Sequence, residues 1–79
     1  MTSRLYTRAG DDLLIIEENS DGVFLHIVRK SGMWSDSWHQ SIDDAKKQAQ
    51  HEFKGLQNIW NVATDDHSTL KDFAKKISS

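Results

Sequence analysis

The residues best suited to chemistry gather in the segment 34–45, which runs Trp-Ser-Asp-Ser-Trp-His-Gln-Ser-Ile-Asp-Asp-Ala. His39 follows Asp36 closely and precedes two further aspartates, and a histidine beside carboxylates can act as a general base or bind a metal. The sequence provides no phosphate-binding glycine loop, no nucleophile in a recognisable turn and no His-x-x-x-His pair. We therefore expect no catalytic residue, no metal site and no cofactor, and an enzyme centred on His39 and Asp36 is the weakest hypothesis.

The two tryptophans of this segment indicate an interaction surface. In a regular strand Trp34, Asp36 and Trp38 share one face and His39 lies on the other, because side chains alternate. Exposed tryptophans that flank a carboxylate suit an interface, since Trp combines a large contact area with a polar N–H. The alternative is that they belong to the core. Trp38 directly precedes a predicted helix and is expected to pack beneath it, whereas both interpretations stay open for Trp34.

Short runs of β-branched and aromatic residues separated by turn-forming clusters predict an antiparallel meander. The predicted strands cover residues 5–7, 13–18, 23–30 and 33–39, with a further extended segment at 59–64.

A helix is predicted near 42–54. Ser41 is a suitable N-cap, and Asp43 and Asp44 suit the positive end of the helix dipole. Gly55 is expected at the C′ position, where glycine commonly ends a helix. The apolar stripe of this helix consists of Ile42, Ala45, Ala49, Phe53 and Leu56.

A second helix is predicted near 66–77, beginning at Asp65 and Asp66. Its apolar face comprises Leu70, Phe73, Ala74 and Ile77, and its remaining surface carries Lys71, Lys75 and Lys76. With 79 residues and no cysteine, the sequence predicts one α+β domain spanning 1–79. Its fold class is an antiparallel β-meander of three to five strands packed against one amphipathic helix, with a second C-terminal helix.

The predicted sheet is apolar on both faces. In the segment 23–28, Val23, Leu25 and Ile27 alternate with Phe24, His26 and Val28. The first helix can cover only one face. The other face is covered either by the C-terminal helix or by a second copy or a partner protein, and both possibilities stay open.

Charge and hydropathy exclude several classes of function. The net charge is −2 with 28% charged residues of mixed sign, which is not a nucleic-acid or membrane-surface footprint. The longest apolar run, 13–16, is far shorter than the roughly 20 residues of a membrane-spanning helix. We expect a cytoplasmic protein with no membrane association and no evident small-molecule substrate.

Nucleic-acid binding is the alternative function. Arg4, Tyr6 and Arg8 alternate on one face of the first strand, and Arg29 and Lys30 end another, so bases could stack beside phosphate-binding cations. The acidic net charge and the lack of an RNP-like or GXXG motif make this alternative less favoured. Charged residues on an edge strand would also discourage aggregation.

The segment 35–45, continued by Gln48-Ala49 and Glu52-Phe53, resembles a group of small, functionally uncharacterised bacterial proteins. Their pattern is Asp, Thr or Ser, Trp, His, any residue, Ser, an aliphatic residue, any residue, Asp, Ala, and then Gln-Ala and Glu-Phe at helical spacing. Ser37 stands where that pattern usually has Thr. The resemblance implies a strand-to-helix junction and a bacterial source, and brings no activity.

The preferred hypothesis is a non-enzymatic, bacterial protein-interaction module, an adaptor or an immunity-like inhibitor. It would bind a protein partner or a second copy through the apolar sheet face and the strand 34–39. The candidate interaction residues are Phe24, His26, Trp34, Asp36, Trp38 and His39.

Overall fold

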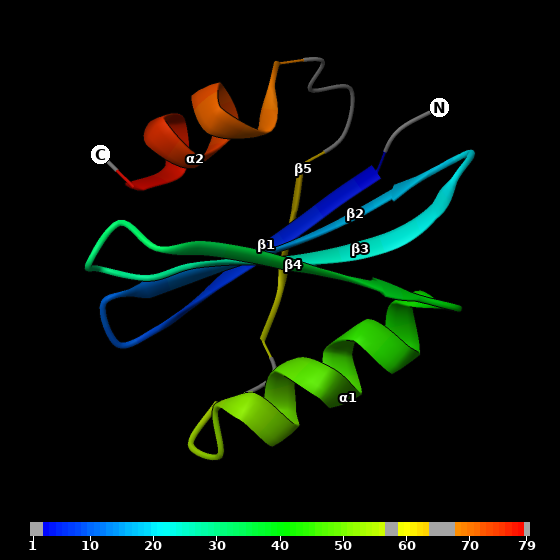
Figure 1. The fold of residues 1–79 in the computed structure, drawn as a ribbon, viewed down its shortest axis with the longest axis horizontal. Coiled ribbons are helices and arrows are strands. Elements are labelled where there is room, and N and C mark those ends of the chain that lie inside the picture. The colour runs from blue at the N-terminus through cyan, green and yellow to red at the C-terminus, as the bar shows by residue number, and fades with distance from the viewer. Residues whose placement is uncertain (1–2, 57–58, 64–67, 79) are drawn as a thin grey trace.

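Five antiparallel strands form one open sheet with a helix on each side, which confirms the α+β prediction (Figure 1). The computed structural model describes residues 3–56, 59–63 and 68–78. The strands are β1 (Ser3–Ala9), β2 (Asp12–Asn19), β3 (Gly22–Val28), β4 (Trp34–His39) and β5 (Asn61–Ala63). The helices are α1 (Ile42–Glu52) and α2 (Leu70–Ser78).

The sheet is built around β2. Leu13, Leu14, Ile15 and Ile16 are each at most 5% exposed, so β2 is apolar on both faces. Consecutive strands pair as hairpins, and β5 returns to the free side of β1, which gives the order β4-β3-β2-β1-β5. The predicted final strand at 59–64 is shorter than expected, with β5 limited to three residues; Thr64 lies outside the described residues.

Helix α1 covers one face. The Ser41 hydroxyl accepts a hydrogen bond from the backbone N–H of Asp44 (3.1 Å), so the predicted N-cap is confirmed. Ala45 and Ala49 are fully buried against Leu14, Ile16, Leu25 and their neighbours, because their small side chains let the helix approach the sheet closely.

The predicted end of α1 is wrong. The helix stops at Glu52 with Phe53 as C-cap, and Gly55 is not among the glycines with positive φ. The Leu56 N–H bonds to the Phe53 carbonyl (2.9 Å), and Arg29 lies over the Phe53 ring at 4.8 Å. The helix thus ends at Phe53, whose ring packs against the core, and not at Gly55.

Helix α2 covers part of the opposite face, where Phe73 and Ala74 pack on Leu13 and Ile15. The described helix begins at Leu70, and the Thr69 hydroxyl caps its first turn by accepting from the Asp72 N–H (3.2 Å). Asp65 and Asp66 lie outside the described residues. In the described part of the chain, no helix is long and apolar enough to cross a membrane.

Polar contacts fasten α2 to β1. Arg4 is buried, pairs with Glu17 at 2.9 Å and lies over the Phe73 ring at 5.0 Å. Tyr6 packs edge-on against the same ring, with 5.7 Å between centroids. The Arg8 guanidinium donates to the Ile77 carbonyl (2.7 Å) near the end of the helix. Phe73 is thus the anchor of α2.

Phe73→Ala tests this anchor. Removing a ring that is 1% exposed leaves a cavity beneath α2, and we expect the free energy of unfolding to fall by about 3 kcal/mol or more. Urea denaturation measures the loss, and amide exchange should show α2 losing protection first. The matched control, Lys71→Ala on the exposed side, should change stability by less than about 0.5 kcal/mol. Unchanged stability in Phe73→Ala would contradict this account.

Candidate interaction surface

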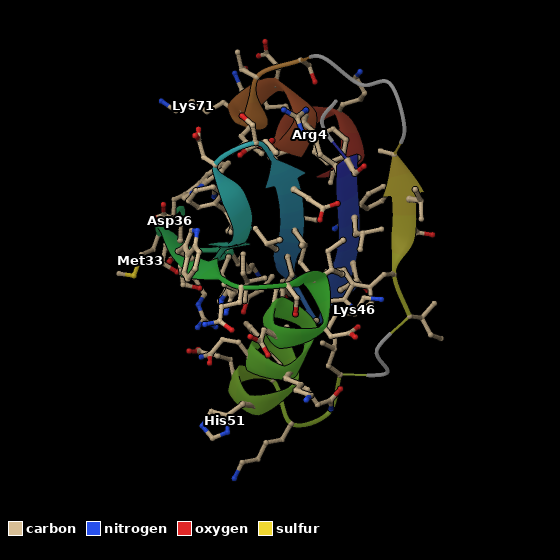
Figure 2. All side chains as sticks on the ribbon, turned by 90° about the vertical axis from the view of Figure 1, so that its right-hand side faces the viewer. Arg4, Met33, Asp36, Lys46, His51 and Lys71 are labelled. Carbon is tan, nitrogen blue, oxygen red and sulfur yellow. The ribbon has the colours of Figure 1, made fainter. Side chains whose placement is uncertain are left out.

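Strand β4 forms one outer edge of the sheet and is the least buried strand. Five of its six residues are classed as exposed, and Met33, just before it, is 69% exposed. Its pairing with β3 is continuous from Val23–His39 to Val28–Trp34. Met33 and Asp36 project from the side of the molecule farthest from β5 (Figure 2). An extended, regular backbone edge is therefore open to a further strand.

Five of the six predicted interaction residues share one face. The register places Trp38 opposite Phe24 and Asp36 opposite His26, with Trp34 beside them on the face that α2 only partly covers. We call these five residues the aromatic surface. Phe24 and His26 stack with their ring centroids 6.4 Å apart, and Trp34 meets the His26 ring edge-on at 6.1 Å.

The expectation that Trp38 packs beneath the first helix is wrong. Trp38 is 57% exposed and lies on the face opposite α1. Its indole N–H donates to the Asp21 carbonyl (3.3 Å), and its ring lies directly against Gly22, where a Cβ would clash with it. The Trp38 ring can therefore pack on the β2–β3 hairpin because Gly22 has no side chain. Neither Gly22 nor Met33 was predicted to belong to this site.

His39 does not join the aromatic surface. It lies on the α1 face of β4, whereas Asp36 lies on the other, so the suggested His39–Asp36 acid–base pair is not assembled. The His39 ring contacts the Ser37 hydroxyl through Nε2 at 2.8 Å. Both residues lie on the edge strand, and neither lines the groove between β1 and the end of α1 or the groove beside α2. Among the described residues, no hydrogen bond joins the other ring nitrogen of His39 to an orienting group.

The basic stripe suggested for nucleic-acid binding is placed differently from expectation. Arg4 is 6% exposed, and Tyr6 packs with Phe73 beneath α2. Strand β1 lies between β2 and β5, so it is not the edge strand that the charges suggested. Arg29 turns to Asp12 (3.2 Å) and Glu52 (3.7 Å). These residues hold the helices in place and do not form an open stacking platform.

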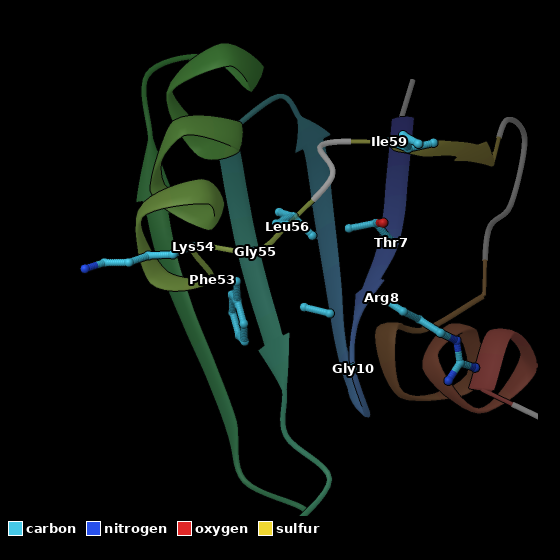
Figure 3. A pocket seen from close by; sticks show the side chains of 9 residues that line it. Thr7, Arg8, Gly10, Phe53, Lys54, Gly55, Leu56 and Ile59 are labelled. Carbon is cyan, nitrogen blue, oxygen red and sulfur yellow. The ribbon is translucent and has the colours of Figure 1, made fainter.

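The described residues contain no group of three or more His, Cys, Asp or Glu side chains that could hold a metal ion. A groove of about 480 Å³ lies between β1 and the end of α1 (Figure 3). Phe53 and Leu56 line its wall, while the side chains of Lys54 and Arg8 extend away from it. This groove therefore brings no charged group toward a ligand.

Comparison with known proteins gives no matching family model, no similar curated protein and no similar solved structure.

His26 is the titratable group that the aromatic surface perturbs. Burial lowers the pKa of His26 below its ordinary value of 6.5, against the opposite, smaller effects of Glu17 and Asp36. The Trp34 indole N–H donates to His26 Nδ1 (3.4 Å), which requires that nitrogen to be unprotonated. The neutral imidazole therefore supports the position of the Trp34 ring.

This pKa has a testable consequence for stability. The folded state binds a proton on His26 more weakly than the unfolded state. The contribution of the neutral imidazole to the free energy of unfolding is therefore fully present above about pH 6.5 and is lost as the pH falls toward the lowered pKa. His26→Gln cannot titrate. We expect the stability difference between wild type and His26→Gln, measured in urea, to shrink from about pH 7.5 to about pH 5. Parallel pH profiles would contradict the assignment.

Proposed function

We propose that the protein is a non-enzymatic interaction module that captures an extended segment of a partner protein on the open edge of β4. The single observation that supports this proposal is the contrast between the two sheet edges. On one side β5 is only three residues long. On the other side β4 offers six residues of regular backbone with two exposed tryptophans. The resemblance to bacterial proteins and the lack of cysteine favour a bacterial, cytoplasmic setting.

Proteins normally protect such an edge. Lysine, proline, a β-bulge or a covering element discourages a second chain from pairing with it. Strand β4 contains neither lysine nor proline, and its register with β3 has no bulge. An added strand would gain main-chain hydrogen bonds, while alternate side chains would contact Trp34, Asp36 and Trp38.

A second copy is a poor occupant at neutral pH. In two-fold antiparallel pairing of β4 with itself, opposite residues must lie on the same face. Registers centred on Ser35, Asp36 or Ser37 place the two Asp36 carboxylates directly opposite or diagonal to each other. Like charges at these positions destabilise a sheet. The strand therefore favours a different chain.

Asp36 also defines the chemistry of that chain. A carboxylate between two tryptophans matches a strand with lysine or arginine opposite Asp36 and apolar residues two positions to either side. Cation–π contact with Trp34 or Trp38 would add to the charge pairing. The expected partner segment has the pattern apolar, any residue, basic, any residue, apolar.

A charge swap tests this pattern with the capped peptide Thr-Val-Thr-Lys-Thr-Val-Thr and its Glu-for-Lys counterpart. Wild type should bind the Lys peptide about fivefold more tightly, since one cross-strand charge pair is worth about 1 kcal/mol at most. Asp36→Lys should reverse the preference, and Trp38→Ala should weaken both peptides. Shifts of β4 amide resonances during NMR titration measure the binding.

Glu18→Lys is the matched control, because it makes the same charge change at an exposed β2 position on the other face. It should keep the preference of wild type. Equal affinity for both peptides, in wild type and Asp36→Lys alike, would overturn the role of Asp36. If light scattering showed a stable dimer of the wild type, the occupant of the β4 edge would be a second copy and not a partner protein.

A further inference from the structure

His26 lies in the middle of the aromatic surface and touches the residues on both sides of it. Its ring is 7% exposed and contacts the rings of Phe24 and Trp34. Asp36 lies directly opposite His26 in the register of β3 and β4. Histidine is the side chain whose ordinary pKa lies closest to neutral pH. One protonation step on this imidazole therefore acts on both Trp34 and Asp36.

The contact with Trp34 requires a neutral imidazole. The Trp34 indole N–H donates to His26 Nδ1 at 3.4 Å, and the indole nitrogen can only donate. A proton on Nδ1 would set two donors against each other, so the indole N–H would lose its acceptor. Trp34 is the first residue of β4, so this change affects the start of the open edge strand.

The contact with Asp36 changes in the opposite sense. Opposite charges that face each other across neighbouring strands attract, so an imidazolium at His26 would pair with the Asp36 carboxylate. That carboxylate is the group expected to pair with a basic residue of a captured strand. Protonated His26 would compete with the partner for it.

The charged groups around His26 come from three strands. Burial, the largest effect, lowers the pKa of His26 below 6.5, so the imidazole is neutral at about pH 7.5. Glu17 of β2 and Asp36 of β4 act against this lowering, whereas Arg4 of β1 acts with it.

Helix α2 adds two cations near Trp34. Lys71 and Lys75 line, together with Trp34, the groove between α2 and the ends of β2, β3 and β4. Lysine side chains ordinarily stay charged at and below neutral pH, so these two do not change charge when His26 does.

We propose that strand capture at β4 is linked to a proton on His26: the edge binds its partner while the imidazole is neutral and releases it when the imidazole is protonated. This inference rests on the proposed function, because it assigns a regulation to the same edge. A bound strand and a bound proton then oppose each other, and each weakens the binding of the other by the same factor.

Titration of wild type with the capped peptide Thr-Val-Thr-Lys-Thr-Val-Thr tests the link. The pH is lowered from about 7.5 until the ring resonances of His26 show that it is protonated. The affinity should fall about fivefold or more, at the low end of ordinary coupling between two sites, with the midpoint of the His26 titration. The Trp34 indole N–H resonance should move with the same midpoint in the absence of peptide.

The reciprocal measurement needs no variant. Saturating peptide should move the midpoint of the His26 titration to lower pH, because linkage acts equally in both directions. A counterpart peptide with Gln in place of Lys should lose less affinity on acidification, since it makes no charge pair with Asp36.

His26→Gln removes the titration and keeps an amide oxygen that can accept from the Trp34 indole N–H. This variant should bind the Lys peptide with little change over the same pH range. The matched control, His51→Gln, makes the same substitution at an exposed position of α1 and should keep the pH dependence of wild type.

The outcomes separate this inference from the proposed function. A Lys peptide that does not bind at about pH 7.5 would overturn strand capture and the proton link with it. Binding that is unchanged when His26 becomes protonated, or a His26 midpoint that peptide does not move, would overturn the link alone. A pH dependence that persists in folded His26→Gln would overturn the role of His26. If that variant unfolds, the midpoint shift in wild type decides.

Discussion

The structure depends on a run of four consecutive residues, Leu13 to Ile16, that must be shielded from water on both sides of a strand. Alternation sends Leu13 and Ile15 to one face and Leu14 and Ile16 to the other. One helix cannot satisfy both faces, so the chain places α1 on the first and α2 on the second. The central position of β2 in the sheet follows from the same requirement, since an edge strand would leave this apolar run partly exposed.

The two helices meet this requirement unequally. Helix α1 packs two alanines against the sheet and has a capped first turn. Helix α2 is shorter and packs mainly through the buried ring of Phe73. Because α2 covers Leu13 and Ile15 but leaves the β3–β4 side of this face open, the ring of His26 contacts those of Phe24 and Trp34 there. The aromatic surface and the groove between α2 and the ends of β2, β3 and β4 are thus two consequences of one incompletely covered sheet face.

Local signals in the sequence predicted the local structure well. The strand meander, the Ser41 cap and the shared face of Trp34, Asp36 and Trp38 all follow from turn chemistry, hydroxyl geometry and side-chain alternation. Each involves residues close together in the chain, so its physical cause can be found in a short segment.

The errors concern contacts between distant residues. Trp38 was assigned to the wrong neighbours because pairing with β3, not proximity to α1, decides its face. Arg4 and Tyr6 were predicted to form an open stacking platform. In the structure they are covered by Phe73, which lies more than sixty positions later in the chain. Helix α1 ends at Phe53, whose ring packs against the core, and not at Gly55 as the glycine alone suggested.

The docking of α2 links the stability of this helix to the groove beside it. A helix of nine residues is not stable alone in water, so α2 is ordered by its contacts with the sheet. The groove between α2 and the ends of β2, β3 and β4 exists only while α2 is docked, because Lys71, Ala74 and Lys75 belong to that helix. A ligand that binds the docked form stabilises it by mass action. Trp34 lines this groove and is also the first residue of the open edge strand β4, so both features share one indole ring.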